Sequence, residues 1–420
     1  MSSKLRIAVW YNLPSGGGKR ALNDHLKGLK ARGHEIVAWR PPVPQVDYLP
    51  VSEIVEEHEI PLDVKASRRG GQIGWVRQGL DASLALREAM IAHAQAAARE
   101  IEAGGFDVLF ANTCLNYYAP WIGRYARLPK LLYLQEPNRV LYEAPHTPWP
   151  ALPQRPSEAR SLRGRYRDMR SDLRNVLDVQ GVRRQAADEV ENARTYDRIL
   201  VNSSFSRESV LRAYDLNAEV CYLGVDADRF ENRRLPRERF VISVGTFHKT
   251  KNPEFVVRAI ATIRENRPAL VWVANSVFED ERTRVEALAK DLGVDLQVRQ
   301  YVPDADLLDL LNRATATVYA PRLEPFGYGP LEANACGLPA VVVSEGGVKE
   351  TVVDGLNGLV VPHHPEAMGA AIAGLLARPE EARAMGERAA KHVREIWSLE
   401  RATDRLERNL LEVANKPPVG

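Results

Sequence analysis

The chain has 420 residues, more than one hydrophobic core usually serves, so we expect about two or three domains. Its 57 basic and 55 acidic residues leave a net charge of +2, which excludes a general nucleic-acid binder because such proteins carry a basic domain. The cysteines Cys114, Cys221 and Cys336 are widely separated and form no CxxC, which indicates reduced thiols in a cytoplasmic protein rather than disulfides or a zinc site.

Short apolar runs alternate with helical patterns through the first half of the chain. The first run, residues 5–10, is too short for a signal peptide and predicts a buried strand. Further strands are predicted at residues 35–39, 107–111, 130–134, 198–202 and 219–223. No stretch approaches the roughly 20 apolar residues of a spanning helix, so we expect a cytoplasmic protein whose membrane contact, if any, is peripheral to the inner face.

A glycine run follows the first predicted strand and precedes a helical pattern. Gly16, Gly17 and Gly18 approach the dinucleotide-binding fingerprint, in which a glycine loop holds a phosphate at a helix start. The acidic residue that this fingerprint needs at the end of the second strand is missing, because Trp39 and Arg40 stand there. The run alone is therefore weak support for a dinucleotide site.

Two segments of the first half carry no clear period. Residues 41–79 mix Pro, Gly and charged residues and are expected to be irregular. Residues 144–184 open with five prolines and carry nine arginines against four acids between residues 155 and 184. We interpret this Arg-rich insertion as a solvated segment with an amphipathic helix. The alternative is a surface for an anionic acceptor or for phospholipid head groups.

The second half repeats the alternation of strands and helices. Its strands are predicted at residues 239–244, 269–274, 296–299, 316–319, 339–343 and 358–361. Runs of about five residues rich in Val, Ile and Leu indicate parallel strands that are covered on both faces. Two such series in one chain predict an α/β fold of two Rossmann-like, doubly wound domains.

The domain boundary is expected in the polar segment 224–238, which separates the two series of strands. This gives an N-terminal domain over residues 1–225 and a C-terminal domain over residues 226–397. A last helix at 398–420 begins after Ser398, a suitable N-cap, and we expect it to pack back on the N-terminal domain.

The densest group of unusual residues lies at 322–339, directly after a predicted strand. Open α/β sheets bind ligands at the carboxyl ends of their strands. Gly327 and Gly329 let the backbone approach a ligand closely, Pro330 suits the first helical position, and Gly337 suits a helix end. The free N–H groups of such a helix start favour a phosphate or sugar oxygens.

Two carboxylates bracket this loop, Glu324 before the expected helix and Glu332 in its expected first turn, with seven residues between them. They are placed to reach one ligand from two directions, and adjacent hydroxyls of a ribose or hexose are natural partners for ionised carboxylates. A lone Glu near a helix start commonly only complements the helix dipole. The preceding strand and the glycine loop favour ligand binding instead.

This block resembles the Glu–seven–Glu motif of the retaining family 4 glycosyltransferases, which have the GT-B fold. The similarity continues at residues 33–37, 202–204, 208–210, 223–226, 344–352 and 354–361. It spans nearly the whole chain and is strongest from 239 to 361. The resemblance implies two Rossmann-like domains that face each other across a cleft. It also implies a metal-independent hexosyltransferase that uses a nucleotide-diphosphate sugar as substrate, needs no cofactor and retains the anomeric configuration.

The same resemblance implies roles for individual residues. Glu332 would bind the nucleotide ribose, Glu324 would lie near the donor sugar, and Lys251, shortly after the first strand of the second domain, would grip the diphosphate. Catalysis is thereby assigned to Glu324 and Lys251. The other donor-binding positions that it implies are Thr246, Val302, Phe326, Gly327, Tyr328, Gly329 and Leu331.

The sequence departs from the family pattern at two positions. Thr246 stands where the family usually has an Arg that supplies a second diphosphate ligand. Gln135 stands near where the family often has a His, and an amide can donate a hydrogen bond but cannot carry charge or shuttle a proton. Gln135 and the glycine run 16–18 are expected to line the N-domain side of the cleft.

The donor and the acceptor are predicted only by class. GDP-mannose is slightly favoured, because residues 135–139 with Tyr142 resemble a segment of members that transfer mannose in polysaccharide biosynthesis. UDP-glucose and UDP-N-acetylglucosamine follow closely, and the acceptor is a glycan, a lipid-linked sugar or a small molecule. The alternatives are a catalytically silent nucleotide-sugar-binding protein and an NAD(P)-dependent oxidoreductase. Asp226 and Asp304, each in an Asp-x-Asp pair, are expected to cap turns rather than bind metal.

Overall fold

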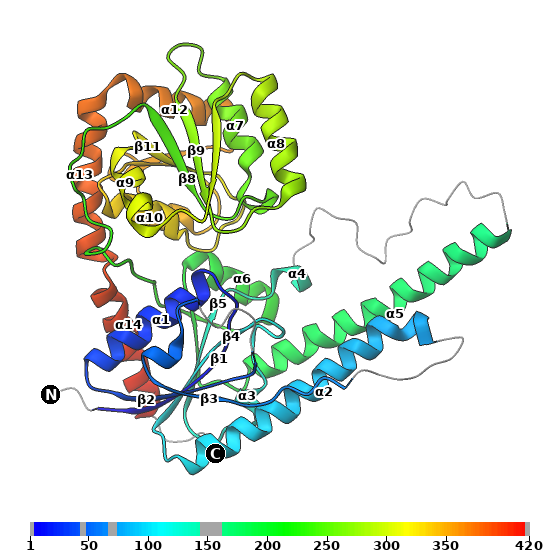
Figure 1. The fold of residues 1–420 in the computed structure, drawn as a ribbon. Coiled ribbons are helices and arrows are strands. Elements are labelled where there is room, and N and C mark those ends of the chain that lie inside the picture. The colour runs from blue at the N-terminus through cyan, green and yellow to red at the C-terminus, as the bar shows by residue number, and fades with distance from the viewer. Residues whose placement is uncertain (1–3, 43–47, 66–73, 143–161, 416–420) are drawn as a thin grey trace. The chain divides into compact units, whose positions relative to one another are not determined.

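The computed structural model describes residues 4–42, 48–65, 74–142 and 162–415. The chain divides into two compact units. The N-terminal unit comprises Met1–Val201, Arg207–Val220 and Leu406–Gly420, and the C-terminal unit comprises Asn202–Ser206 and Cys221–Arg405. Each unit contains one fully parallel β-sheet (Figure 1).

The N-terminal unit has a sheet of seven strands in the order β3-β2-β1-β4-β5-β6-β7. These strands are β1 (Arg6–Asn12), β2 (Glu35–Arg40), β3 (Glu56–Glu59), β4 (Val108–Cys114), β5 (Lys130–Gln135), β6 (Arg198–Val201) and β7 (Glu219–Val220). The helical segments are α1 (Gly17–Ala31), η1 (Val51–Glu53), α2 (Gly74–Ala103), α3 (Ile122–Tyr125), α4 (Arg139–Tyr142), α5 (Leu162–Ala193), most of α6 (Ser204–Tyr214) and the end of α14 (Leu399–Ala414). The order reverses between β1 and β4, as in a doubly wound Rossmann sheet.

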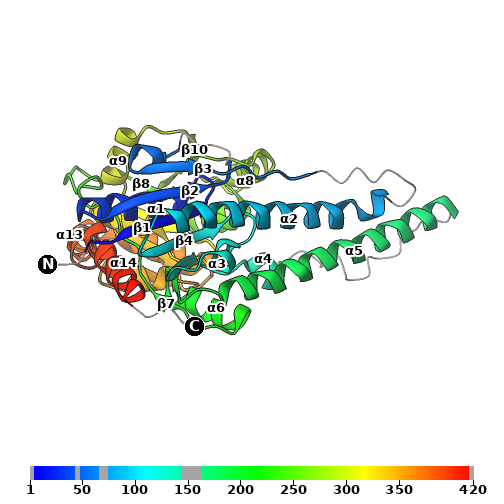
Figure 2. The ribbon, with the colours of Figure 1, turned by 90° about the horizontal axis from the view of Figure 1, so that it is seen from below.

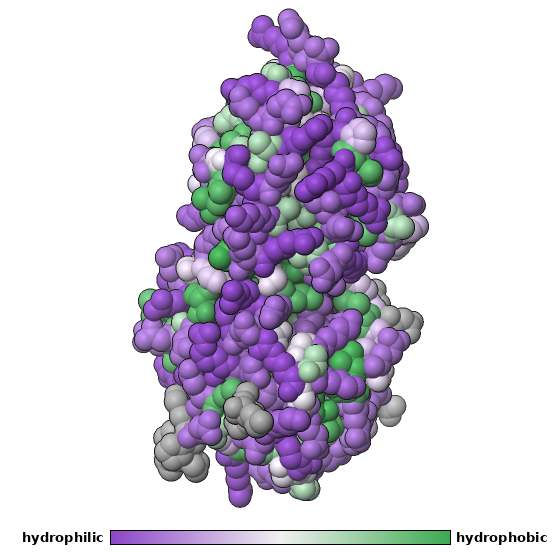
Figure 3. Space-filling model, turned by 90° about the vertical axis from the view of Figure 1, so that its left-hand side faces the viewer, coloured by the Kyte–Doolittle hydropathy of each residue, from purple (hydrophilic) through white to green (hydrophobic). Residues whose placement is uncertain are grey.

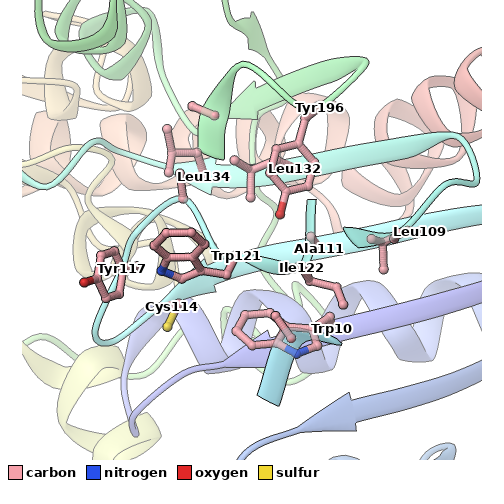
Figure 4. Close-up of a cluster of buried hydrophobic side chains, with 14 of the residues drawn as sticks. Trp10, Leu109, Ala111, Cys114, Tyr117, Trp121, Ile122, Leu132, Leu134 and Tyr196 are labelled. Carbon is pink, nitrogen blue, oxygen red and sulfur yellow. The ribbon is translucent and has the colours of Figure 1, made fainter. Parts of the chain in front are cut away.

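Alternate side chains of the central strands pack on opposite faces of this sheet. On one face Trp10 of β1 donates a hydrogen bond to His93 of α2, and Trp121 and Tyr117 extend the same buried cluster (Figure 4). On the other face Phe110 and Tyr133 contact the His25 ring of α1. Burial on both faces explains why the central residues of β1, β4 and β5 are mostly apolar.

Helices α2 and α5 run side by side and in the same direction along one face of the sheet (Figures 1 and 2). They approach closely because Gly79 of α2 lies against Asp178 and Gly181 of α5 lies against Ser83. Nearer the sheet, Arg87 of α2 forms an ion pair with Asp188 of α5. The prediction that residues 41–79 are irregular was therefore wrong in part, since β3 and the start of α2 lie there.

The Arg-rich insertion predicted at 144–184 contains the first two-thirds of α5, which agrees with the amphipathic helix expected there. Residues 144–161 of that insertion lie outside the described residues. Strand β3 was missed because Glu56–Glu59 carries no apolar side chain. It pairs with β2 at the sheet edge, where Arg40 forms an ion pair with Glu57 at 3.1 Å. Polar contacts, rather than apolar alternation, hold this strand.

The C-terminal unit has a sheet of six strands in the order β10-β9-β8-β11-β12-β13. These strands are β8 (Phe240–Val244), β9 (Ala269–Ala274), β10 (Leu296–Gln300), β11 (Ala316–Tyr319), β12 (Ala340–Val343) and β13 (Gly358–Val361). The helical segments are η2 (Lys249–Lys251), α7 (Pro253–Ala261), α8 (Glu279–Asp291), α9 (Asp304–Arg313), α10 (Tyr328–Ala335), α11 (Val348–Thr351), α12 (Pro365–Ala377) and α13 (Pro379–Ile396). The order reverses between β8 and β11. The two doubly wound domains that the sequence predicts are thus confirmed.

Helix α14 begins as expected after Ser398, whose hydroxyl accepts the backbone N–H of Arg401 at 3.3 Å. Its apolar residues Ala402, Leu406, Leu410 and Val413 are buried, and its second half belongs to the N-terminal unit. On the face seen in Figure 3, hydrophilic side chains cover most of the surface and hydrophobic ones form small, separate groups. Among the described helices, none is both long and apolar enough to cross a bilayer.

Candidate donor site in the C-terminal unit

The candidate site lies at the carboxyl ends of β8 and β11, the neighbouring strands at which the order of the sheet reverses. Ligands of open α/β sheets bind at this switch point. The loop after β8 leads to η2 and the loop after β11 leads to α10. Asn252, in the left-handed region with φ 57°, donates its side-chain amide to the carbonyl of Ala320 at 3.2 Å. This hydrogen bond ties the two loops together.

Lys251 and Glu324 meet between these loops, although 73 positions separate them in the sequence. The ammonium of Lys251 lies 2.7 Å from a carboxylate oxygen of Glu324 and 3.4 Å from the hydroxyl of Tyr319. Burial opposes the charge of Lys251, but Tyr319 and Glu324 outweigh it, so the pKa of this lysine is raised. Burial and the neighbouring Glu324 raise the pKa of the Tyr319 phenol. The lysine is therefore a fixed cation, and Tyr319 a neutral hydroxyl.

The backbone of the Glu324 loop rests on a second glycine pair. Gly347 donates its N–H to the carbonyl of Glu324 at 2.7 Å. A Cβ on Gly346 would lie 2.4 Å from the same carbonyl, and a Cβ on Gly347 would lie 2.0 Å from the carbonyl of Pro325. Gly346 also has φ +67°, which favours glycine. These two glycines hold Glu324 in place, a role that sequence reasoning missed.

Helix α10 begins differently from the prediction. Gly327 is its N-cap, with φ +95°, and Tyr328 is its first residue, so Pro330 stands at the third position rather than the first. Gly329 precedes that proline and approaches the Tyr319 ring and the end of β8. A Cβ on Gly327 would lie 3.0 Å from a methyl of Val348. The helix start is thus set by the glycine, which alone accepts this conformation and this contact without strain.

Glu332 lies in the second turn of α10, not the first as predicted. Its side chain is only 5% exposed, and its neighbour Leu331 is fully buried. Burial, and after it the charge of Glu332, raise the pKa of the Cys336 thiol to about 12. Gly337 ends the helix at φ +69°, as predicted. The structure thus places Glu332 as a buried carboxylate on a short helix that follows the glycine loop.

The remaining predicted donor residues are more dispersed. Thr246 lies in the loop between β8 and η2, where its carbonyl accepts the N–H of His248 at 3.0 Å. The ring of Phe326 is buried against Tyr328 and Trp397. Only the backbone of this residue is therefore placed to contact a ligand. Val302 follows β10, the edge strand that β9 separates from β8. It therefore stands at the far end of the same sheet edge.

The residues predicted for the N-terminal side lie together in their own unit. Gly16, with φ +146°, is the N-cap of α1, and Gly17 opens the helix. A Cβ on Gly18 would lie 3.1 Å from the side-chain amide of Gln135. Gln135 has φ 63°, and its buried amide nitrogen has no hydrogen-bond partner among the described residues. The glycine run after β1 and Gln135 at the end of β5 are thus in contact.

A buried carboxylate of the N-terminal unit was missed by sequence reasoning. Glu189 of α5 is fully buried and accepts hydrogen bonds from the Tyr118 N–H at 3.1 Å, the Asn138 amide at 3.3 Å and the Tyr214 hydroxyl at 2.6 Å. Burial raises its pKa, although these donors oppose the shift. The three donors come from the loops after β4 and β5 and from α6, so Glu189 fixes those loops. Glu189 lies in a helical stretch of mixed polar and apolar residues, so nothing in the sequence predicts that it is buried.

The two Asp-x-Asp pairs make different contacts. A carboxylate oxygen of Asp226 accepts the N–H groups of Asp228 at 3.1 Å and Arg229 at 2.9 Å, as expected of a capping residue. The prediction that Asp304 caps α9 was wrong, because Pro303 is the N-cap and Asp304 is the first helical residue, where it forms an ion pair with Arg229 at 2.5 Å. Within the described ranges, no three His, Cys, Asp or Glu side chains gather where they could hold a metal ion.

Known proteins resemble this chain both in sequence and in fold. Residues 225–392 match the family described as "Glycosyl transferases group 1". The D-inositol 3-phosphate glycosyltransferase of Saccharomonospora viridis is 33% identical over 236 residues, which are 50% of this chain and 54% of that protein. The corresponding enzyme of Salinispora tropica is 32% identical over 248 residues, 52% of this chain and 50% of that protein. The chain thus spans about half the length of the curated relatives it matches.

Solved structures match over nearly the whole chain. A glycosyltransferase from Rickettsia africae has a TM-score of 0.69 at 16% identity, with 99% of this chain and 100% of that chain covered. Anabaena HepE in complex with UDP has a TM-score of 0.69 at 15% identity, with 97% of this chain and 100% of that chain covered. These likenesses show the fold, which is GT-B, with two Rossmann-like domains built on sheets of seven and six strands.

Proposed function

Residues 225–392 match the glycosyl transferases group 1 family, and from that match we propose that the chain is a retaining glycosyltransferase of this family. It takes a hexose from a nucleotide-diphosphate sugar and passes it to a glycan, a lipid-linked sugar or a small molecule. The observation that carries the proposal is the Lys251–Glu324 pair at the switch point of the sheet, at 2.7 Å, beside the glycine start of α10.

The donor binds between the loops after β8 and β11. Its diphosphate lies beside Lys251 and over the backbone N–H groups of the glycine loop and the start of α10, between Phe326 and Leu331. Glu332 accepts hydrogen bonds from the ribose hydroxyls, and Glu324 lies beside the donor sugar. The base extends toward Val302. Thr246 supplies a hydroxyl where a second cation would otherwise hold the diphosphate, so Lys251 provides most of the positive charge.

The transfer step needs little covalent chemistry from the protein. The bond between the anomeric carbon and the diphosphate oxygen breaks, and the acceptor oxygen bonds to that carbon from the same face. The acceptor proton passes to the departing phosphate oxygen, and the anomeric configuration is retained. Lys251 and the α10 amides stabilise the charge that develops on the leaving diphosphate. Glu324, by its ion pair, keeps Lys251 protonated and aimed at that oxygen.

For the donor we favour GDP-mannose slightly, on the segment from Gln135 to Arg139, with UDP-glucose and UDP-N-acetylglucosamine next. The N-terminal unit binds the acceptor substrate through Gly16, Gly17, Gly18 and Gln135. The buried amide nitrogen of Gln135 can donate a hydrogen bond to that substrate. The curated relatives carry the name D-inositol 3-phosphate glycosyltransferase, so a phosphorylated polyol belongs among the acceptors to test. We place the reaction in the cytoplasm, where nucleotide sugars would reach this site.

A thermal-shift screen tests the donor class, because a ligand that binds only the native state raises its stability. The protein is heated with GDP-mannose, UDP-glucose, UDP-N-acetylglucosamine, ADP-glucose or dTDP-glucose, and with NADPH. We expect one nucleotide sugar to raise the Tm, and mass spectrometry to show slow donor hydrolysis or transfer. Stabilisation without any turnover would instead establish a silent binding protein, the alternative that Thr246 and Gln135 motivate. A shift with NADPH alone would establish an oxidoreductase.

A further inference from the structure

Glu350 of α11 caps the first turn of another helix, α6. Its carboxylate accepts the backbone N–H of Ser204 at 2.8 Å and that of Phe205 at 3.0 Å. The hydroxyl of Ser203 accepts the next N–H, that of Ser206, at 3.0 Å. A helix start leaves four N–H groups without a backbone acceptor, and side chains satisfy three of them here. The carboxylate of Glu350 also complements the positive end of the α6 dipole.

The turn that Glu350 caps lies where the chain passes between its two units. Residues Asn202–Ser206 belong to the C-terminal unit, and α6 from Arg207 onward belongs to the N-terminal unit. The chain returns to the C-terminal unit at Cys221. The next residue, Tyr222, donates its hydroxyl to the Glu350 carboxylate at 2.8 Å. Within the C-terminal unit, one carboxylate therefore binds the chain both where it leaves and where it returns.

Glu350 also follows closely on the glycine that supports the Glu324 loop. Helix α11 begins at Val348, directly after Gly347, whose N–H binds the Glu324 carbonyl at 2.7 Å. A Cβ on Gly347 would in addition lie 3.0 Å from the Cβ of Ser203, the residue before α6. Gly347 is therefore packed between the donor loop and the start of α6, and this position leaves no room for a side chain.

A row of aromatic rings connects Glu350 with the same loop by a second route. The centre of the Tyr222 ring lies 5.1 Å from that of Trp397, and the centre of the Trp397 ring lies 5.8 Å from that of Phe326. Trp397 and Phe326 are buried, and Phe326 stands two residues after Glu324. The two routes form a closed ring of contacts. Because packed interiors transmit displacements, the donor loop and the start of α6 are expected to move together.

We infer that Glu350 is a positioning residue of the donor site, and that donor binding is coupled to the order of the first turn of α6. The inference rests on the proposed function, because the coupling acts on the loop where the donor is proposed to bind. While Glu350 caps α6, Gly347 and Phe326 keep the Glu324 loop in the conformation that binds the donor. When the cap opens, the loop loses this support. By reciprocity, a bound donor favours the capped state by the same factor by which the cap favours donor binding.

Amide hydrogen exchange measures this coupling directly. The N–H groups of Ser204, Phe205 and Ser206 bind side-chain oxygens, so they exchange when the cap opens. The full-length protein is compared with and without the nucleotide sugar that raises its Tm, and peptides that cover α6 are followed by mass spectrometry. We expect the donor to slow the exchange of these three groups about fivefold or more. A residue that served only the stability of the fold would leave this exchange independent of the donor.

Glu350→Gln removes the charge and one of the two acceptor oxygens of the cap. We expect the variant to lose the donor-dependent slowing and to bind the donor about fivefold more weakly or worse by calorimetry, a factor that should match the slowing in the wild type. Tyr222→Phe removes one hydrogen bond but keeps the contact with Trp397, so its loss should be smaller. The matched control is Glu102→Gln in the N-terminal unit. Glu102 accepts the backbone N–H of Arg127 at 3.2 Å, and this variant should bind and exchange as the wild type does.

Two results would overturn the inference while the proposed function stands. One is equal donor affinity in the wild type and Glu350→Gln, and the other is exchange at the start of α6 that the donor does not change. If no nucleotide sugar stabilised the wild type, the proposed function itself would fail, and the inference with it. Circular dichroism should show that the variants are folded. Should Glu350→Gln unfold, Tyr222→Phe decides by the same two measurements.

Discussion

The charge of Lys251 is controlled by its two neighbours, Glu324 and Tyr319. Burial of the ammonium favours the neutral form, and the neighbours reverse this preference. A raised lysine pKa means that the favourable charge is fully present below the ordinary value of about 10.4 and is lost only as the pH rises through the higher folded-state pKa. Lys251 should therefore stay charged across the whole neutral and mildly alkaline range.

Glu324→Gln tests this control directly. The substitution removes the negative charge but keeps the shape of the side chain, so burial should lower the pKa of Lys251. We expect turnover to fall by about 10²-fold, the usual effect of disturbing one group that stabilises a developing charge. Donor affinity, measured by calorimetry from pH 7 upward, should decline at a lower pH in the variant than in the wild type. Identical pH profiles in the two proteins would contradict this role of Glu324.

Gly346 provides a second test at this scale, because its role depends on space as well as on φ. Gly346→Ala places a methyl group 2.4 Å from the Glu324 carbonyl in a left-handed conformation. The left-handed backbone alone costs about 1–2 kcal/mol, and the clash displaces the Glu324 loop in addition. We expect a lower Tm and a loss of donor affinity.

Gly355→Ala is the matched control for that variant. Gly355 has φ +74°, and a Cβ there would meet nothing within 4 Å. It should therefore show only the backbone cost, about 1–2 kcal/mol in stability, with unchanged donor affinity. If both alanine variants bind the donor equally well, the glycine pair does not position Glu324.

At the scale of the elements, α14 connects the two units, and its second half is fixed by charge as well as by its apolar face. Glu407 of α14 is 14% exposed and accepts hydrogen bonds from Arg32 at 2.5 Å and from the buried His34 ring at 2.9 Å. Burial opposes the charge of Glu407, but His34 and Arg32 outweigh it, so the pKa of this carboxyl is lowered. Its contribution is therefore present above the ordinary carboxyl pKa of about 4.3 and is lost as the pH falls through the lower folded-state value.

Glu407→Gln should destabilise the protein at neutral pH by about 1–3 kcal/mol, since it removes a charge that holds the partly buried Arg32 and the buried His34. The difference from the wild type should shrink in acid, as the wild-type carboxyl becomes protonated. Glu395→Gln on α13 is the control, because its exposed pair with Lys391, at 3.8 Å, should contribute less than about 1 kcal/mol. Thermal unfolding followed across pH measures both effects. A Glu407→Gln variant as stable as Glu395→Gln would show that α14 is held by its apolar face alone.

The elements that sequence could predict are those whose pattern is local. Most strands of both units are apolar runs with few exposed residues, so their positions were predicted correctly. Strand β3 is a row of charged and polar residues whose partners come from β1 and β2, and α2 opens inside a segment rich in glycine. Their stability depends on contacts between distant parts of the chain, which a single sequence does not reveal.

The same distinction applies to the candidate site. Glu324 and Lys251 were predicted from the motif around each. Their ion pair is a consequence of strand order, because β8 and β11 are neighbours in the sheet and not in the sequence. The helix start was misplaced because Pro330 suits the first helical position. Gly327 begins the helix earlier, and this moves Glu332 to the second turn. The support of Glu324 by Gly346 and Gly347 is likewise a contact between loops.

At the scale of the whole molecule, each unit has its own sheet, core and candidate ligand groups. The donor site we propose lies wholly within the C-terminal unit, whereas the Gly16–Gly18 run and Gln135 belong to the N-terminal unit. Donor binding and acceptor use should therefore be separable by substitution. Gln135→Ala should leave the donor affinity unchanged and lower the rate of transfer. Calorimetry together with a transfer assay measures this, and an equal loss of both would mean that Gln135 contributes to donor binding.

The central claim is that a nucleotide sugar is held in the C-terminal unit by Glu332. Its most direct test is calorimetric titration of the stabilising nucleotide sugar into the wild type and into Glu332→Gln, which preserves the shape of this buried residue. A hydrogen bond to a charged group contributes about 1.5–3 kcal/mol, so the variant should bind about ten- to a hundredfold more weakly. Circular dichroism should confirm that it remains folded. Equal donor affinity in the two folded proteins would contradict the account.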